Sequence, residues 1–252
     1  MGVVNMKIKK ACLFILFAFM LIASSITIKV NAVNTGFQTD EISIDRKNSF
    51  LSSINISVIS EEPPKKDFTC FAVSSDHLIA IAQNTFNSSK QTVCIYSNEG
   101  VFQYGYTFDC LGFYELEWDR ENLNIYFIRG NFLVSVTPSG EVLDVLKVRE
   151  KEVENRKYSN EVLGSVKRTV DGTEYSIKND MGILRICSLS SFSKIIVKDS
   201  NGNESIIYDV NSMLFKKAII ILSIFSILVP IAVIGGIRNM KKRKQKIKFI
   251  VF

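Results

Sequence analysis

The hydrophobic pattern divides the chain into two long apolar segments and a region of short alternating runs between them. Residues 11–23 are apolar and uncharged, and residues 218–237 form a second uncharged run of twenty residues. At about 1.5 Å of rise per residue, twenty helical residues span roughly 30 Å, the thickness of the hydrocarbon core of a bilayer. The pattern therefore predicts an N-terminal apolar helix and a C-terminal transmembrane helix over residues 214–237.

The N-terminal apolar segment has the features of a secretory signal peptide. Lys7, Lys9 and Lys10 precede it, and the small-residue triplet Val-Asn-Ala at 30–32 offers a cleavage site before Val33. An uncleaved membrane anchor is the alternative, and it would make the chain a two-pass protein. The first 32 residues are therefore interpreted as a signal peptide or an N-terminal anchor.

The charges that flank the second apolar run predict the topology. Residues 238–252 contain no acidic residue, and their basic residues are Arg238, Lys241, Lys242, Arg243, Lys244, Lys246 and Lys248. Positive residues stay on the cytoplasmic side of a membrane span and lie against anionic lipid. The tail is thus predicted to be cytoplasmic, with the lipid bilayer as its partner. The region between the two apolar segments is predicted to be extracytoplasmic, in a protein of the cell membrane.

The predicted span also carries a weak packing signal. Ala232 and Gly236 are four residues apart, which is the spacing of small residues that lets two membrane helices approach closely. Another membrane or surface protein is therefore a possible partner.

The first part of the extracytoplasmic region, residues 33–67, is polar and irregular. One alternating run at 54–59 predicts a strand, and Pro63-Pro64 ends it because consecutive prolines donate no ladder hydrogen bonds. We interpret this part as a membrane-proximal stalk with an edge strand.

Residues 68–213 show short β-runs separated by turn residues, which predicts a mainly β domain of antiparallel strands. A highly charged insertion at 149–163 interrupts the runs. Because its acidic and basic residues are mixed, it is expected to be a solvated loop or a short exposed helix.

The β-runs repeat. Gly100 and Gly140 are forty residues apart and end or nearly end the turn phrases SNEG and PSGE, and Gly202 ends a third phrase, DSNG. A unit of about forty residues with four short strands is typical of a propeller blade. The units resemble β-propeller blades of the YVTN, NHL or WD-repeat general type, over roughly residues 68–210. About three units are visible, so an incomplete propeller and an open stack of sheets are both compatible with the pattern.

The chain also resembles small single-pass membrane proteins of low-GC Gram-positive bacteria. The resemblance implies a membrane location and brings no function with it.

Charge excludes one class of function for the middle of the chain. Residues 33–213 hold 18 Lys and Arg and all 25 Asp and Glu, so this region has a net charge of −7 although the whole chain has +6. A nucleic-acid-binding domain needs a basic surface. We therefore predict no nucleic-acid partner.

The candidates for chemistry are few. Glu115, Glu117 and Asp119 lie on one face of a predicted strand, where paired carboxylates could perform acid–base chemistry or bind calcium. The favoured interpretation is a polar face that alternates with buried apolar residues. His77, the single histidine, is interpreted as a turn residue. The sequence predicts no catalytic, cofactor-binding or metal-binding residue and no cofactor.

Four cysteines lie outside the N-terminal segment: Cys70, Cys94, Cys110 and Cys187. In an exported domain they permit two disulfides, with three possible connectivities. Cys70 and Cys110 precede similar points of successive units, so their pairing is one possibility. Cys94 and Cys187 sit within apolar runs, where buried free thiols are also common.

These patterns predict a membrane-anchored, extracytoplasmic β-domain that acts as a non-catalytic binding or accessory module. Two alternatives remain open at this stage. One is a small subunit of a membrane complex that docks through the span, and the other is a cell-surface hydrolase that uses carboxylates.

Overall fold

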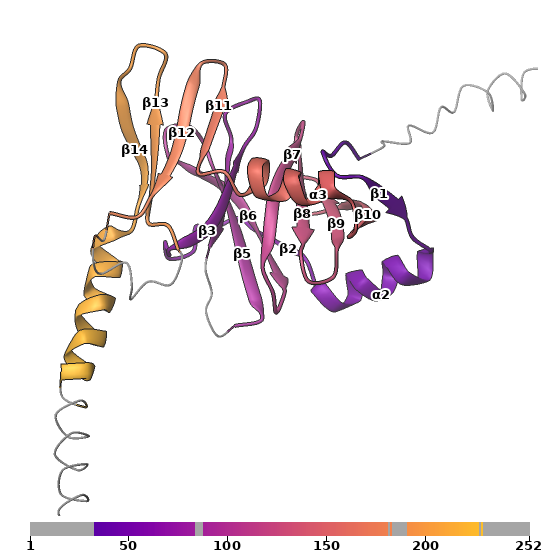
Figure 1. Ribbon diagram of the computed structural model, residues 1–252, viewed down its shortest axis with the longest axis horizontal. Helices are drawn as coiled ribbons and strands as arrows, with labels where there is room; N and C mark the ends of the chain where they lie inside the picture. Colours follow the sequence, from indigo (N-terminus) through magenta and orange to yellow (C-terminus); the bar gives the residue numbers. More distant parts are fainter. Residues whose placement is uncertain (1–32, 84–87, 181, 183–190, 227, 229–252) are drawn as a thin grey trace, which may run out of the picture. The chain divides into compact units, whose positions relative to one another are not determined.

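The computed structural model describes residues 33–83, 88–180, 182, 191–226 and 228. In these residues the chain is mainly β, with three antiparallel sheets and few helices, as Figure 1 shows. The mainly β, antiparallel fold predicted from the sequence is confirmed.

One sheet lies between the other two, and we call it the middle sheet. Its order is β2 (Ser57–Ile59), β6 (Phe102–Asp109), β5 (Lys90–Tyr96), β4 (Ile79–Gln83) and β3 (Phe68–Val73). Every residue of β4 is buried, since Ile79 and Ile81 pack on one neighbouring sheet and Ala80 and Ala82 pack on the other. Burial of both faces explains why β4 and the end of β5 read as continuous apolar runs.

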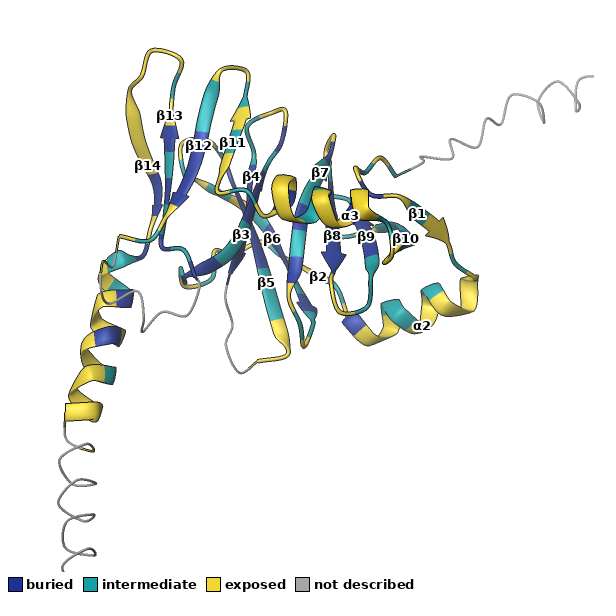
Figure 2. Cartoon of the chain, in the orientation of Figure 1, coloured by how far each residue is buried: buried dark blue, intermediate teal, exposed yellow. Residues whose placement is uncertain are grey.

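The second sheet, the β7–β10 sheet, packs on one face of the middle sheet. Its order is β1 (Thr39–Glu41), β10 (Val142–Val148), β9 (Phe132–Val136), β8 (Asn122–Phe127) and β7 (Tyr114–Asp119). The helix α2 (Ile44–Ile54) closes the end of this interface with Phe50, Leu51 and Ile54. Figure 2 shows that α2 and β1 are mostly exposed, whereas β4 and most of β8 and β9 are buried.

The third sheet, the β11–β14 sheet, packs on the opposite face of the middle sheet. Its strands are β11 (Lys167–Val170), β12 (Thr173–Lys178), β13 (Lys194–Lys198) and β14 (Glu204–Asp209), in chain order. Tyr175, Ile195 and Tyr208 fill the interface together with Ile79 and Ile81 of the middle sheet.

Each sheet contains four strands that are consecutive in the chain and antiparallel: β3–β6, β7–β10 and β11–β14. The three turn phrases found in the sequence connect the last two strands of each unit. Gly100 and Gly140 adopt φ of 79° and 84° there, a conformation that favours glycine. A Cβ atom on Gly100 would also lie 2.6 Å from the carbonyl oxygen of Ile207, so this turn packs directly on β14.

The region interpreted as a stalk is instead part of the domain. β1 pairs with β10, β2 pairs with β6, and α2 contributes Ile54 to the core. Most residues of α2 are polar and Ile54 is its one buried residue, so the hydrophobic pattern of this helix is weak.

The charged insertion becomes a linker that crosses the outer face of the β7–β10 sheet. It forms the short helix α3 (Val153–Lys157) and the π-helical η1 (Tyr158–Leu163). Most of its charged residues are exposed, as expected, but Asn155 and Leu163 are buried. Leu163 packs with Phe37 and Tyr126, so the linker covers apolar surface as well as connecting two sheets.

A helix follows β14 and occupies residues 211–226. Leu214 and Ala218 are buried and cluster with Met213, which also packs against the core between the middle sheet and the β11–β14 sheet. None of the helices in the described part of the chain is long and apolar enough to span a bilayer. The predicted signal or anchor segment (1–32), most of the predicted span with Ala232 and Gly236, and the basic tail from Arg238 to Lys248 lie outside the described residues.

Candidate functional site

The three carboxylates singled out in the sequence lie on the outer face of the β7–β10 sheet. Tyr114, Leu116 and Trp118 point the other way, into the core between the sheets. The polar face is not open to solvent, because the N-terminal segment 33–38 and the linker lie across it.

Glu117 is the centre of these contacts. Its carboxylate accepts hydrogen bonds from the Thr35 hydroxyl (2.6 Å), the Gly36 backbone N–H (2.9 Å) and the Tyr158 hydroxyl. Asp119 is buried and accepts the backbone N–H of Asn34 at 2.8 Å. The two side chains therefore attach the N-terminal segment to the sheet. The bonds engage the carboxylates that a hydrolase would need free for catalysis.

Glu115 attaches the linker to the same face. The Ser159 hydroxyl donates to its carboxylate at 2.8 Å. Burial raises the pKa of Glu115, and the Ser159 hydrogen bond and the nearby Arg168 charge offset only part of this rise. Arg168 is itself held by the carbonyl oxygen of Leu163 at 2.7 Å and lies over the ring of Phe71.

The raised pKa of Glu115 gives a pH-dependent prediction. Since its folded-state pKa lies above the unfolded value of about 4.3, the stability linked to this group is full at low pH and is lost as pH rises through the folded-state pKa. We expect Glu115→Gln to raise the melting temperature relative to the wild type more at pH 7 than at pH 4. Thermal unfolding followed by circular dichroism from pH 4 to pH 7 measures this. The control is Glu121→Gln, because Glu121 is exposed in the turn after β7. An equal effect of Glu115→Gln on the melting temperature at every pH would contradict the raised pKa of Glu115.

His77 lies in the turn between β3 and β4 with φ of 61°, and its N–H donates to the Ser74 carbonyl oxygen at 3.1 Å. Its Nδ1 is 2.7 Å from the Tyr175 hydroxyl, and Asp171 is 3.9 Å from its Nε2. Within the described residues, no group of three or more His, Cys, Asp or Glu is arranged to hold a metal ion. The histidine thus links the middle sheet to the β11–β14 sheet.

Cys70, Cys94 and Cys110 are free thiols, so the pairing of Cys70 with Cys110 is not formed in this structure. Cys187 lies outside the described residues. Burial raises the pKa of Cys70 and of Cys94 to about 12 in each case. Few thiolates therefore exist at these positions at neutral pH, and both cysteines are expected to be unreactive.

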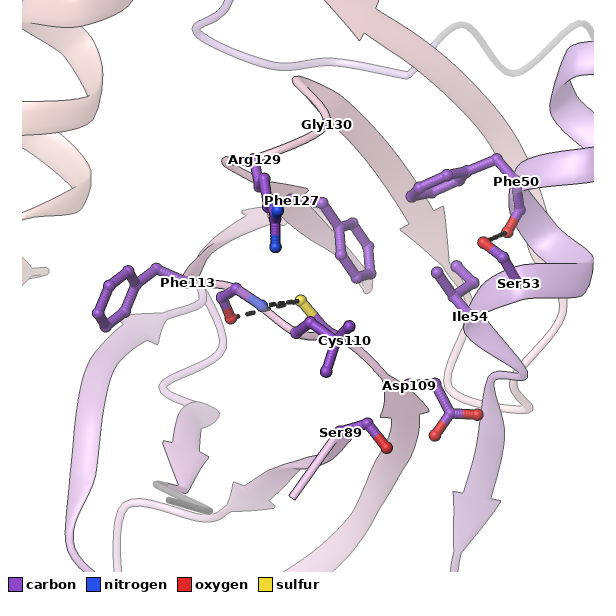
Figure 3. Close-up of a pocket in the computed structure, with 12 residues that line it drawn as sticks. Phe50, Ser53, Ile54, Ser89, Asp109, Cys110, Phe113, Phe127, Arg129 and Gly130 are labelled. Carbon is purple, nitrogen blue, oxygen red and sulfur yellow. Dashed lines mark hydrogen bonds between the residues drawn. The ribbon is translucent and has the colours of Figure 1, made fainter. Parts of the chain in front are cut away.

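A pocket of about 450 Å³ lies at one end of the sheets, and we call it the α2 pocket (Figure 3). It is formed by α2, the end of β6 with the loop to β7, the end of β8 with the loop to β9, and Ser89 just before β5. Its apolar walls come from Phe50, Ile54, Leu111, Phe113 and Phe127.

The inner wall of the α2 pocket is ordered by aromatic packing. The rings of Phe50 and Phe127 meet edge to face with centroids 5.3 Å apart, and Phe108 packs on Phe127 at 5.4 Å. The rim is different, because Leu111 is 81% exposed and Phe113 is 76% exposed. Two large apolar side chains thus stand in solvent at the mouth of an apolar cavity, an arrangement that usually marks a binding surface.

The polar groups of the pocket lie at separate places. Arg129 stands above the cavity, between Phe113 and Phe127 in Figure 3, and is exposed. Asp109 accepts a hydrogen bond from the Asn55 side-chain amide at 3.0 Å. The Cys110 thiol donates to the Gly112 carbonyl oxygen at 3.4 Å, and burial raises its pKa. The chemistry available is therefore apolar contact plus one guanidinium, which suits binding.

The chain matches no protein-family model, no curated protein and no solved structure. The geometry of the described residues alone therefore carries the functional argument.

Sequence reasoning missed the α2 pocket. The signal that could have found it is the phrase Leu111-Gly112-Phe113, in which two large apolar residues stand in a connection between two β-units, where polar turn residues are usual. Phe50 and Ile54 of the opposite wall are more than fifty positions away in α2, so spacing along the chain could not bring them together with Leu111 and Phe113.

Proposed function

We propose that this protein is a membrane-anchored β-domain on the extracytoplasmic side of the cell membrane, acting as a non-catalytic binding module. The helix after β14 holds the domain beside the bilayer, and the basic tail keeps the C-terminus in the cytoplasm. The α2 pocket is the surface that binds.

The observation that carries the proposal is the exposure of apolar side chains on the helix at residues 211–226. Phe215, Ile219, Ile220, Ile224 and Phe225 are all exposed there. A helix that shows large apolar residues to solvent on several sides is suited to a hydrocarbon environment and costly in water. The same helix leads into the uncharged run that ends at residue 237, ahead of the basic tail.

For the architecture, we propose an open stack of three blade-like sheets. Three units of four consecutive antiparallel strands with a glycine turn before the last strand support the blade-like description. The order of the sheets supports the open form. Consecutive blades of a propeller are neighbours, but the second unit (β7–β10) and the third unit (β11–β14) are separated by the first unit (β3–β6).

Membrane extraction tests the anchoring. The full chain is expected to stay in the membrane pellet during an alkaline carbonate wash, because its span is held by the hydrophobic effect. A chain of residues 33–213 lacks both apolar segments and is expected in the soluble fraction. Release of the full chain by carbonate would contradict the proposal.

A further inference from the structure

We propose that the α2 pocket binds an anionic phospholipid of the membrane that anchors the domain. An acyl chain would occupy the apolar cavity, and the phosphate would lie against the cations at its edge. The inference rests on the proposed function, because it requires a bilayer beside this end of the sheets.

The first argument is position. Lys217 of the C-terminal helix contacts Asp67 at 3.5 Å, directly before β3. The register Phe68↔Gln83 and Lys90↔Asp109 places the start of β3 and the end of β6 at the same end of the middle sheet. The α2 pocket begins at Asp109, so it lies at the end of the sheet from which the helix departs.

The distance along the helix agrees with this placement. The uncharged run begins at Ala218, seven residues after the helix begins at 211. At about 1.5 Å of rise per residue, the hydrocarbon region would begin roughly 10 Å from the start of the helix. The loops at this end of the sheets are then within reach of the lipid headgroups.

The second argument is shape and polarity. A volume of about 450 Å³ falls in the range of roughly 300–1,000 Å³ that small-molecule pockets have. Phe50, Ile54 and Phe127 form a fixed apolar wall, while Leu111 and Phe113 protrude at the mouth. Exposed apolar side chains beside a bilayer gain free energy by entering its interface. The two rim residues would therefore carry the mouth of the pocket to the lipid.

The third argument is charge. Arg129 lines the pocket, Lys147 donates to the Gly130 carbonyl oxygen at 2.7 Å, and Arg46 lies over the ring of Phe132, which packs on Phe50. Among the described residues, none of these three cations is paired with a carboxylate. Unpaired Arg and Lys side chains beside an apolar cavity match a ligand with an anionic head and an apolar tail.

The test uses the full chain in nanodiscs that contain phosphatidylglycerol with a diazirine in one acyl chain. After irradiation, mass spectrometry identifies the labelled peptides. We expect label in residues 109–113 and in α2 in addition to the span. Label confined to the span would overturn the proposal.

A matched pair of variants on α2 tests occupancy of the cavity. Ser53 lines the pocket and the adjacent Ser52 does not, although both are exposed and both donate to a backbone carbonyl oxygen of the helix. Ser53→Trp is expected to fill the pocket and abolish labelling of residues 109–113. Ser52→Trp is expected to retain it, and equal labelling of the two variants would contradict binding in the cavity.

A second pair tests the headgroup contact. Arg129→Gln is expected to reduce labelling by the phosphatidylglycerol probe roughly tenfold, the loss expected for one charge-assisted contact. Arg120→Gln, in the exposed turn between β7 and β8, is the control and should change nothing. A phosphatidylcholine probe should label the wild type less than the anionic probe, and equal labelling would overturn the charge argument.

The carbonate wash of membranes that hold the same full chain separates the two proposals. A chain that stays anchored but shows no label at the pocket overturns lipid binding and leaves the proposed function intact. A chain that is washed from the membrane overturns the proposed function itself.

Discussion

Replacing Ile81 with alanine is expected to lower the free energy of unfolding by about 2–5 kcal/mol, the cost of removing a large aliphatic side chain from a packed core. Ile81 is fully buried between the middle sheet and the β11–β14 sheet, in contact with the cluster that contains Tyr175 and Ile195. The smaller side chain leaves a cavity because the rigid sheets on both sides cannot close it. Chemical denaturation followed by circular dichroism measures the loss.

The matched control is Ile206→Ala on β14. Ile206 is 56% exposed, so the same chemical change should cost about 0.5 kcal/mol or less. Equal losses of stability in the two variants would contradict the burial of Ile81 between the middle sheet and the β11–β14 sheet.

Glu117→Ala is expected to destabilise the protein by about 2–4 kcal/mol, since hydrogen bonds to a charged acceptor are strong and their donors lose their partner together. The affected donors are the Thr35 hydroxyl, the Gly36 N–H and the Tyr158 hydroxyl. Hydrogen exchange at the Gly36 amide should rise because the N-terminal segment is released from the sheet.

Glu121→Ala, at the exposed turn after β7, is the control for losing one negative charge and should leave the exchange unchanged. A double-mutant cycle with Tyr158→Phe isolates the contact between the two side chains. Additive effects of Glu117→Ala and Tyr158→Phe would contradict the hydrogen bond that joins the N-terminal segment, the linker and β7.

The β-runs of the sequence predicted the sheets well because their signal is local. The turns at Gly100, Gly140 and Gly202 need glycine conformations, and they stand between the strands that the sequence placed around them. Residues 79–82 are continuously apolar because β4 is buried on both faces. The structure shows this burial, and the sequence pattern alone does not.

The parts that the sequence did not predict depend on contacts distant in the chain. Residues 33–38 look polar and irregular, yet they are ordered by Glu117 and Asp119, about eighty positions away. The charge of the linker predicts a solvated segment, and its buried Leu163 is one apolar residue in a charged stretch. Local patterns report propensity and burial, whereas docking of a segment depends on the surface that it meets.

The candidate site shows the same limit. The sequence placed Glu115, Glu117 and Asp119 on one face of a strand, and they share that face. Their role is to hold two other segments, because their hydrogen-bond donors come from residues 33–38 and from the linker. The α2 pocket depends on the junction of a helix with two loops, and its only local trace is the pair Leu111 and Phe113.

The central claim is that the domain faces the outside of the cell while the tail lies inside. A membrane-impermeant maleimide applied to intact cells tests it most directly. Ser200→Cys places a thiol in the exposed turn between β13 and β14, and Gln245→Cys places one in the basic tail. The wild type gives the background from its own cysteines, which include the half-buried Cys70 and Cys110, and is subtracted from each variant.

We predict that Ser200→Cys is labelled in intact cells and that Gln245→Cys is labelled only after the cells are permeabilised. Labelling of Gln245→Cys in intact cells, with Ser200→Cys protected until permeabilisation, would contradict the account.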